Sequence, residues 1–348
     1  MEYPKITIIT PSYNQGQYIE QTIQSVLSQN YPNLEYIIID GGSTDDTIEI
    51  IKKYEDKVTY WISEKDQGQS DAINKGFKKS TGEIINWLNS DDFLEPGCLK
   101  KIAASFSSPS VTAITSTVKN FIEDGIAWEE RTPVMSSSVD YISKGFNNQP
   151  GTFFRKSIWD KYFPLPKQFK YTMDQYLWFC YWLESKPENF KIEDYTTVHF
   201  RRHAASKTSS SLQDEIFNKL GKEFFNEHNL LFWSYFGQTS KAKAKTLESY
   251  FYIGYDFNTR KFFFPTVPTI DKCFIEQIYH GYLIELFKED YRVGNFNRLS
   301  QNITAINRQY LNSRDAEELK RLQGKLKYAP FIKVYRLLYW KAKNLFTR

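Results

Sequence analysis

The feature that most constrains the fold is a repeated alternation of strand-like and helix-like segments in the first hundred residues. Short runs rich in β-branched residues occupy 6–10, 36–40, 58–62 and 84–88, and apolar residues at helical spacing lie between them. Strands separated by helices in this way form right-handed βαβ units and pair in parallel. The sequence therefore predicts an α/β fold, with a Rossmann-like, mostly parallel sheet flanked by helices.

Polar residues follow directly on three of these strands. They are the segments Thr10-Pro11-Ser12-Tyr13-Asn14, Asp40-Gly41-Gly42-Ser43 and Asn89-Ser90-Asp91-Asp92. In parallel sheets, ligands bind at the carboxyl ends of the strands. We therefore expect the three segments to meet at one edge of the sheet and to form a single site.

The chain of 348 residues is longer than one ordinary domain of ~100–200 residues needs. Further strand-like runs at 111–118, 151–155 and 195–200 and an aromatic-rich helix at 173–184 precede a serine run, after which the pattern is mostly helical. These changes predict a catalytic domain at 1–212 and a mainly helical C-terminal domain at 213–348.

The net charge of +4 is unevenly distributed. Residues 320–348 contain nine Lys and Arg and no Asp or Glu, a charge of +9 that leaves −5 for residues 1–319. An acidic body argues against a nucleic-acid partner. The three cysteines form no C-x-x-C pair, and no signal peptide or apolar run of ~18–20 residues is evident, so we expect a cytoplasmic protein.

The segment Asn89-Ser90-Asp91-Asp92 is a candidate metal site. Carboxylates at a strand end are hard oxygen ligands for Mg²⁺ or Mn²⁺, which commonly take one or two protein carboxylates together with substrate phosphates. The alternative is a turn that caps the helix expected after Pro96.

Two other places carry polar groups suited to a nucleotide. Asp40 could accept hydrogen bonds from ribose hydroxyls or a base, or it could be a solvated loop residue before a Gly-Gly turn. Asp71 and Lys75 could face the nucleotide, or Asp71 could serve only to stabilise the first turn of its helix.

Taken together, these segments resemble a known family. Pro11-Ser12-Tyr13-Asn14, Asp40-Gly41-Gly42-Ser43-Thr44-Asp45, Ser63-Glu64-Lys65-Asp66 with Asp71-Ala72-Ile73-Asn74-Lys75-Gly76, and Leu88-Asn89-Ser90-Asp91-Asp92 occur in this order and spacing. The set is similar to the nucleotide-sugar-binding half of a family 2 glycosyltransferase with the GT-A fold. The resemblance covers residues 4–105 and extends more loosely to about residue 210.

The resemblance implies roles for individual residues. Donor binding falls on Pro11, Ser12, Tyr13, Asp40, Asp71, Lys75 and Ser90. The metal, Mn²⁺ or Mg²⁺, falls on Asp91 and Asp92. The sequence departs from the family motif at Asn89, where the first Asp often stands.

The second half of the resemblance concerns the acceptor and the leaving group. Asp174, in Tyr171-Thr172-Met173-Asp174-Gln175-Tyr176-Leu177-Trp178, takes the position of the general base, and Gln149 that of an acceptor contact. His203 and Lys207 lie in a basic, Ser-rich segment that would close over the diphosphate. The alternative for that segment is a solvated linker.

The resemblance implies a metal-dependent inverting enzyme that moves one sugar from a nucleotide-diphosphate sugar to a saccharide or lipid-linked acceptor, in bacterial surface-polysaccharide or glycoconjugate assembly. A nucleotidyltransferase is an alternative, but no Gly-rich triphosphate loop follows the first strand. A non-catalytic nucleotide-sugar-binding scaffold is another. The processive synthases of the family carry a Q-x-x-R-W element that is missing here.

The basic C-terminal segment has a separate explanation. Apolar and aromatic residues of 331–346 fall on one face of a helix, and Lys333, Arg336, Lys341 and Lys343 lie outside that face. Such a helix suits the surface of an anionic membrane, which predicts peripheral attachment at the inner face of the cytoplasmic membrane. The alternative is that the apolar face packs on the helical domain.

Overall fold

The computed structural model describes residues 3–123, 125–145, 148–203, 206, 214–260, 262, 264 and 270–332, with the backbone alone for 214–220. The chain divides into two compact units, Met1–Ser138 with Gly145–Pro268, and Val139–Lys144 with Thr269–Arg348. The functional boundary that the sequence places at 212/213 remains a prediction. By compactness, residues 214–268 belong with the first unit.

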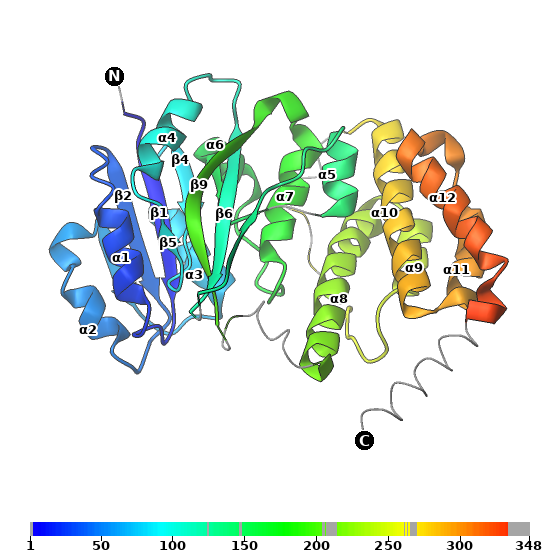
Figure 1. Ribbon diagram of the computed structural model, residues 1–348, viewed down its shortest axis with the longest axis horizontal. Helices are drawn as coiled ribbons and strands as arrows, with labels where there is room; N and C mark the ends of the chain where they lie inside the picture. Colours follow the sequence, from blue (N-terminus) through cyan, green and yellow to red (C-terminus); the bar gives the residue numbers. More distant parts are fainter. Residues whose placement is uncertain are drawn as a thin grey trace. The chain divides into compact units, whose positions relative to one another are not determined.

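The first unit is built on one mixed sheet (Figure 1). Its strands are β1 (Ile6–Ser12), β2 (Leu34–Asp40), β3 (Tyr60–Ser63), β4 (Ile84–Trp87), β5 (Phe93–Leu94), β6 (Ala113–Ile122), β7 (Ala127–Glu130), β8 (Thr152–Arg155) and β9 (Phe190–Arg202). The order is β3-β2-β1-β4-β8-β6-β9-β5, with β7 on β6. Strands β1 to β4 pair in parallel, which confirms the βαβ prediction.

The other half of the sheet is mixed. Strand β8 pairs antiparallel with both β4 and β6, β6 pairs in parallel with β9, and β5 runs antiparallel to β9. The sheet as a whole is therefore mostly parallel near the N-terminus and mixed beyond β4. Together with its helices it confirms the predicted α/β class.

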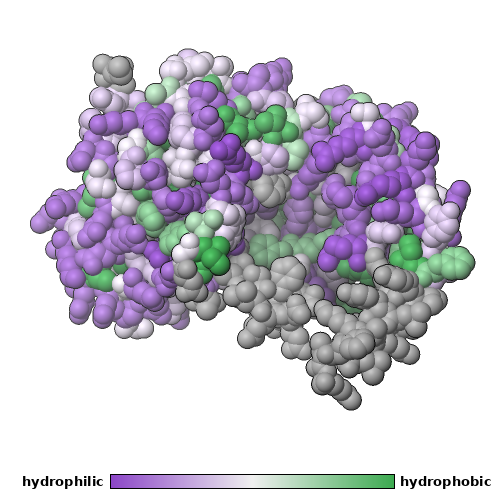
Figure 2. Space-filling model, viewed as in Figure 1, coloured by the Kyte–Doolittle hydropathy of each residue, from purple (hydrophilic) through white to green (hydrophobic). Residues whose placement is uncertain are grey.

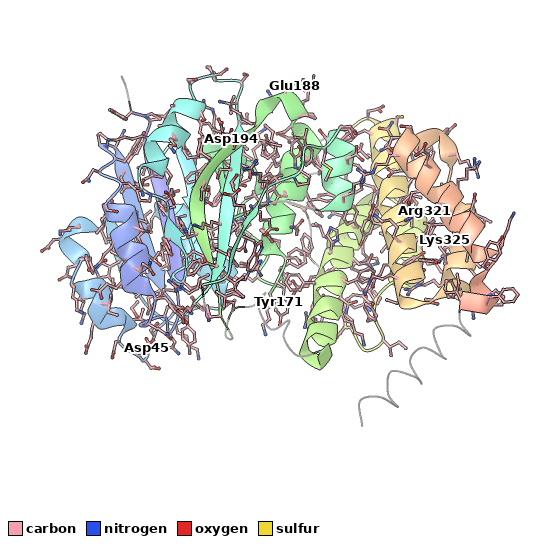
Figure 3. All side chains as sticks on the ribbon, in the orientation of Figure 1. Asp45, Tyr171, Glu188, Asp194, Arg321 and Lys325 are labelled. Carbon is pink, nitrogen blue, oxygen red and sulfur yellow. The ribbon has the colours of Figure 1, made fainter. Side chains whose placement is uncertain are left out.

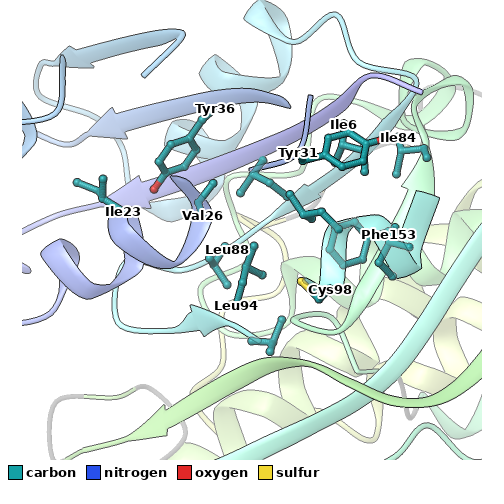
Figure 4. Close-up of a cluster of buried hydrophobic side chains, with 14 of the residues drawn as sticks. Ile6, Ile23, Val26, Tyr31, Tyr36, Ile84, Leu88, Leu94, Cys98 and Phe153 are labelled. Carbon is teal, nitrogen blue, oxygen red and sulfur yellow. The ribbon is translucent and has the colours of Figure 1, made fainter. Parts of the chain in front are cut away.

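One face of the sheet is covered by α1 (Ile19–Leu27), α2 (Thr47–Lys52) and α4 (Cys98–Ser105). Ile23 and Val26 of α1 and Cys98 of α4 are fully buried in one cluster with Ile6 of β1 and Ile84 of β4 (Figure 4). Alternate strand residues supply the sheet side of this cluster, because successive strand side chains point to opposite faces.

The opposite face packs against α3 (Gln69–Lys79), α6 (Lys156–Tyr162) and α7 (Met173–Glu184). A Cβ at Gly76 of α3 would lie 2.5 Å from Cγ2 of Ile9, so only glycine permits this close approach to β1. Trp159 of α6 is fully buried, and its ring contacts those of Trp87 and Phe154 on the sheet.

Helices α8 (Asp214–Thr239) and α9 (Lys241–Glu248) complete the first unit. The ring of Phe179 on α7 lies 5.1 Å from the rings of both Phe232 and Tyr235 on α8. Aromatic packing therefore fixes α8 against the helix that carries Asp174.

The second unit is helical. It contains residues 139–144 of α5 (Ser138–Lys144), α10 (Lys272–Val293), α11 (Phe296–Asn302) and α12 (Ser313–Leu326). Lys144 lies 3.7 Å from Asp315 of α12, and the Asn312 side chain donates to Asp140 of α5. Short 3-10 helices occur at Glu55–Lys57, Pro187–Asn189, Ile303–Ala305 and Arg308–Tyr310.

The face of the molecule in Figure 2 is mostly hydrophilic, with hydrophobic residues in small groups. Among the helices that the structure describes, none has the length and apolar character needed to cross a membrane. The amphipathic helix predicted at 331–346 lies outside the described residues except for its first two positions.

Candidate functional site

A cleft of about 1160 Å³ opens in the first unit at the carboxyl ends of β1, β2 and β4. Pro11, Ser12 and Tyr13 line it from the end of β1, Gly41 and Gly42 from the end of β2, and Asn89, Ser90 and Asp91 from the end of β4. The expectation that the three polar segments meet at one site is thus confirmed by their positions.

Two buried polar atoms of this cleft have no hydrogen-bond partner among the residues that the structure describes. They are Oγ of Ser12 and Oε1 of Gln15, both on residues that line the cleft. Leaving such atoms unpaired costs ~1–3 kcal/mol each. A polar ligand that bonds to them would recover this cost. Tyr13, next to Ser12, is 58% exposed and offers a ring face at the same place.

The loop after β1 is held in position by the loop after β2. The N–H of Asn14 donates to Ser43 Oγ at 2.7 Å, that of Gln15 to Thr47 Oγ1 at 2.8 Å, and that of Gly16 to Asp45 Oδ2 at 2.9 Å. The two loops therefore form one rigid wall of the cleft. This explains why Ser12 and Gln15 can keep unpaired polar atoms in fixed positions.

Asp40 lies behind that wall and is fully buried. Its carboxylate accepts hydrogen bonds from the N–H groups of Gly42 and Ser43, from Ser43 Oγ and from Ser63 Oγ. Asp40 does not itself line the cleft, whereas Gly41 and Gly42 do. In this structure it orients the backbone that faces a ligand, and direct contact with the donor remains a prediction.

Asp71 and Lys75 are also set back from the cleft, in an ion-pair network. Asp71 Oδ1 lies 2.6 Å from Nζ of Lys167, and Lys75 Nζ lies 2.7 Å from Glu64 and 3.8 Å from Asp71. Burial raises the pKa of Asp71, but hydrogen bonds from Lys167 and the Gln67 N–H outweigh it and lower the pKa. The hydrogen bond to Glu64 raises the pKa of Lys75. The network anchors Lys167 and Gln67, which do line the cleft.

The two adjacent aspartates after β4 have different surroundings. Asp91 lines the cleft, and its Oδ2 lies 3.0 Å from Nε2 of His203. Asp92 is 1% exposed, and its two oxygens accept hydrogen bonds from the N–H of Arg201 and the amide of Asn89. Burial and the neighbouring charge of Asp91 raise the pKa of Asp92 well above its usual range.

Arg201, near the end of β9, joins this strand to the turn that carries Asp91 and Asp92. Its guanidinium donates to the backbone oxygen of Asp91 and to Gln21 Oε1, and it lies over the rings of Tyr18 and Phe121. These contacts place His203 beside Asp91. Lys207, the other predicted contact of the basic segment, lies outside the described residues.

Asp174 and Gln149 line the same cleft as the donor candidates. Asp174 is in the first turn of α7, and its Oδ1 accepts a hydrogen bond from the N–H of Gln175. Gln149 is buried, and its amide donates to the backbone oxygen of Trp87 and to Asn86 Oδ1. The cleft thus brings a carboxylate from α7 together with the groups at the ends of β1, β2 and β4.

Some residues of the cleft were not singled out from the sequence. Asp66 lines it close to the backbone of Gly41, and Phe224 of α8 and Arg260 line it from beyond the predicted boundary at 212. Asp66 stands in the polar segment 63–76, so a closer reading of that segment could have found it. Phe224 and Arg260 belong to no motif and could be found only from the fold.

A mostly parallel sheet with helices on both faces, and a cleft at its strand ends that gathers carboxylates and unpaired polar groups, defines an α/β enzyme of the GT-A type. Comparison with known proteins names the family. Residues 7–164 match the model of glycosyl transferase family 2. Residues 7–164 of the chain are therefore similar to this family.

Individual relatives agree with this assignment. An uncharacterized glycosyltransferase of Nostoc sp. is 25% identical over 243 residues, which cover 64% of this chain and 74% of the relative. The putative teichuronic acid biosynthesis glycosyltransferase TuaG of Bacillus subtilis is 39% identical over 101 residues, 28% of this chain and 40% of the relative.

A solved structure shows the same fold. Residues 1–349 of S. aureus TarS, in complex with UDP-GlcNAc, match with a TM-score of 0.57 at 19% identity, over 94% of this chain and 87% of that one. At this level of identity, the likeness shows the fold alone.

Proposed function

We propose that this chain transfers one sugar, with inversion, from a nucleotide-diphosphate sugar to a hydroxyl of a saccharide or lipid-linked acceptor. The observation that carries the proposal is the sharing of one cleft by Asp91, Asp174 and the unpaired buried atoms of Ser12 and Gln15. A donor that bonds to the unpaired atoms would have its diphosphate and its anomeric carbon within the same cavity as both carboxylates.

The donor end of the cleft suits a nucleoside. Ser12 Oγ can donate and Gln15 Oε1 can accept hydrogen bonds from a base or ribose, and the exposed ring of Tyr13 offers a face for stacking. The backbones of Gly41 and Gly42 allow close approach of the ligand. Shape and hydrogen bonding at this end would select the base.

The residues around Asp91 fit a divalent cation. Among the described residues there is no group of three or more His, Cys, Asp or Glu that could hold a metal ion. A cation that is held together with substrate phosphates, however, would need only one or two protein ligands. Asp91 Oδ2 lies 3.0 Å from His203 Nε2, and its carboxylate oxygen is the type of ligand that Mn²⁺ and Mg²⁺ prefer. Bound there, the cation would neutralise charge on the departing nucleoside diphosphate.

Asp174 is the candidate general base. It would accept the proton of the acceptor hydroxyl as that oxygen attacks the anomeric carbon, and the nucleoside diphosphate would leave from the opposite side of the sugar. The hydrogen bond from the Gln175 N–H holds Oδ1 in place, since it fixes the carboxylate against the first turn of α7. Arg202, which also lines the cleft, adds positive charge near the diphosphate.

Binding and hydrolysis of donors test this proposal. A panel of UDP-, GDP-, dTDP- and CDP-sugars is screened by thermal shift with and without Mn²⁺, and release of the nucleoside diphosphate is then measured for each binder. Metal-dependent stabilisation by at least one donor, with slow hydrolysis, supports the enzyme. Binding without hydrolysis by any donor would favour the nucleotide-sugar-binding scaffold, and stabilisation by none would contradict both.

The biological setting belongs to the same proposal. The similarity to TuaG, named as a teichuronic acid biosynthesis glycosyltransferase, supports a role in the synthesis of a bacterial surface polysaccharide. The basic helix predicted at 331–346 would bring the enzyme to the inner face of the cytoplasmic membrane, where lipid-linked acceptors lie. Residues 1–212 would carry the transfer chemistry in this scheme.

A further inference from the structure

The cleft is larger than a single ligand requires. Its volume of about 1160 Å³ exceeds the ~300–1,000 Å³ typical of a site for one small ligand. The candidate donor contacts come mainly from the ends of β1, β2 and β4. A second group of lining residues comes from 167–174 and from α8, and none of this group is a candidate donor contact.

Two aromatic rings stand out in this second group. Tyr171, three residues before Asp174, and Phe224 on α8 both line the cleft and are both partly exposed. Their ring centroids lie 5.1 Å apart, with 39° between the planes. Figure 3 shows Tyr171 at the end of α7 that faces α8. Phe169, two residues earlier, is 2% exposed and packs on Phe262, so exposure of an aromatic ring is not general in this loop.

A buried carboxylate on α8 holds the ring pair together. Glu227 is fully buried and accepts hydrogen bonds from the N–H groups of Lys170, Tyr171 and Thr172 at 2.8, 2.8 and 3.0 Å, and from Thr172 Oγ1. Phe224 stands three residues before Glu227, so both side chains lie on the same face of α8. These hydrogen bonds from residues 170–172 to Glu227, here called the clamp, therefore fix Tyr171 against Phe224 and fix the start of α7.

We propose that Tyr171 and Phe224 form the acceptor subsite and bind the apolar face of a pyranose ring. This inference rests on the proposed function, because it needs an acceptor hydroxyl to be presented to Asp174. The C–H groups on one face of a pyranose are apolar and would pack on the two rings, while its hydroxyls remain at the edge. Gln168 and Lys170, which also line the cleft, can hydrogen-bond to those hydroxyls.

The test compares transfer with hydrolysis in the full chain. With a donor that the wild type hydrolyses, release of nucleoside diphosphate is measured with and without methyl glycosides of common hexoses and N-acetylhexosamines, and the disaccharide is quantified by mass spectrometry. We expect at least one glycoside to act as acceptor. In Tyr171→Ala and Phe224→Ala, the ratio of transfer to hydrolysis should fall at least tenfold, and Phe224→Tyr should restore it.

A matched control is available on the same helix. Phe225 packs on Tyr252, with ring centroids 5.5 Å apart, and is not among the lining residues. Phe225→Ala should keep the wild-type ratio. An unchanged ratio in both Tyr171→Ala and Phe224→Ala, an equal fall in Phe225→Ala, or hydrolysis that no glycoside converts into transfer would each overturn the acceptor subsite while leaving the donor site intact. Absence of hydrolysis with every donor would instead overturn the proposed function.

Discussion

Three carboxylates near the cleft differ in what their oxygens contact, and this difference decides what each can do. Asp91 faces the cleft beside His203, and Asp174 faces it from α7. Asp92 has both oxygens occupied by protein donors and is almost fully buried. We therefore propose direct ligand contact for Asp91 and Asp174 and a structural part for Asp92, whereas the sequence predicts that both adjacent aspartates bind the metal.

Substitution of the adjacent aspartates separates these parts. Asp91→Asn should remove the Mn²⁺-dependent increase in Tm caused by the donor and leave the Tm of the free protein nearly unchanged. Asp92→Asn should lower the Tm of the free protein. An NH₂ group in place of either carboxylate oxygen would face the Arg201 N–H or the Asn89 amide, both of which are donors, so a hydrogen bond worth ~1–3 kcal/mol would be lost. Thermal shift with and without Mn²⁺ measures both; the reverse pattern would show that Asp92 is the ligand.

Asp174→Asn tests the general base. The substitution keeps the size of the side chain and removes the proton acceptor, so kcat for transfer should fall by ~10²–10⁴ while donor affinity is retained. Asp160→Asn on α6, where the side chain is 53% exposed, provides the control and should match the wild type. Transfer near the wild-type rate in Asp174→Asn would mean that another group takes the proton.

Glu35, on β2, makes the stability of the parallel part of the sheet depend on pH. Burial raises its pKa, but hydrogen bonds from Thr7, Thr81 and Lys5 outweigh it and lower the pKa from 4.5 to about 2. A lowered pKa contributes stability that is complete above pH 4.5 and is lost as the pH falls toward 2. Glu35→Gln should therefore reduce the free energy of unfolding most at pH 7, with a difference from wild type that shrinks below pH 4.5. Urea titrations across this range measure it, and a constant difference would contradict the assignment.

At the scale of elements, local sequence patterns predicted the strands and the shared edge but not the contacts beyond them. The run 6–10 and its three successors carry enough β-branched residues to identify β1 to β4, and parallel pairing then places their ends together. The Asp92 carboxylate in the 89–92 turn accepts a hydrogen bond from Arg201, which lies more than a hundred residues away in the chain. The local sequence could therefore not show that Asp91 and Asp92 have different surroundings. Phe224 and Glu227 stand in a helix without a motif, and only packing places Phe224 in the cleft and Glu227 against residues 170–172.

The clamp between α8 and the start of α7 makes a prediction of its own. Glu227→Ala would leave three backbone N–H groups without their acceptor, at a cost of ~1–3 kcal/mol each. We expect a lower Tm and faster hydrogen exchange at residues 170–172. We also expect a transfer-to-hydrolysis ratio that falls as it does in Tyr171→Ala.

The control for the clamp is a carboxylate on a neighbouring helix. Glu248 of α9 accepts one hydrogen bond from Trp233 Nε1 at 3.2 Å and does not line the cleft. Glu248→Ala should leave exchange at 170–172 unchanged. If Glu227→Ala lowered only the Tm and kept the wild-type ratio, the clamp would stabilise the fold without positioning the acceptor subsite.

At the scale of the whole molecule, the uneven charge suggests two kinds of partner. Residues 1–319 carry −5 and contain the cleft for which we propose a cation and a diphosphate, and residues 320–348 carry +9. The described helix α12 ends at Leu326, so most of the basic segment follows it.

Vesicle binding tests the basic segment in the full chain. The wild type should float with vesicles that contain phosphatidylglycerol and not with pure phosphatidylcholine, since each basic residue near an anionic surface contributes ~1 kcal/mol. Replacing Lys333, Arg336, Lys341 and Lys343 with Glu should abolish flotation. Equal flotation of both proteins would show that this segment does not bind the membrane.

The clamp also affects the order in which the enzyme is completed during its synthesis. Lys170 and Glu227, which accepts its hydrogen bond, are 57 residues apart in the chain. The loops after β1 and β2, which form one wall of the cleft, are joined by residues about half that distance apart. A nascent chain can therefore assemble the wall formed by the loops after β1 and β2 before Glu227 is available to bind the loop that carries Tyr171. The proposed acceptor subsite would then form last, only after α8 has left the ribosome.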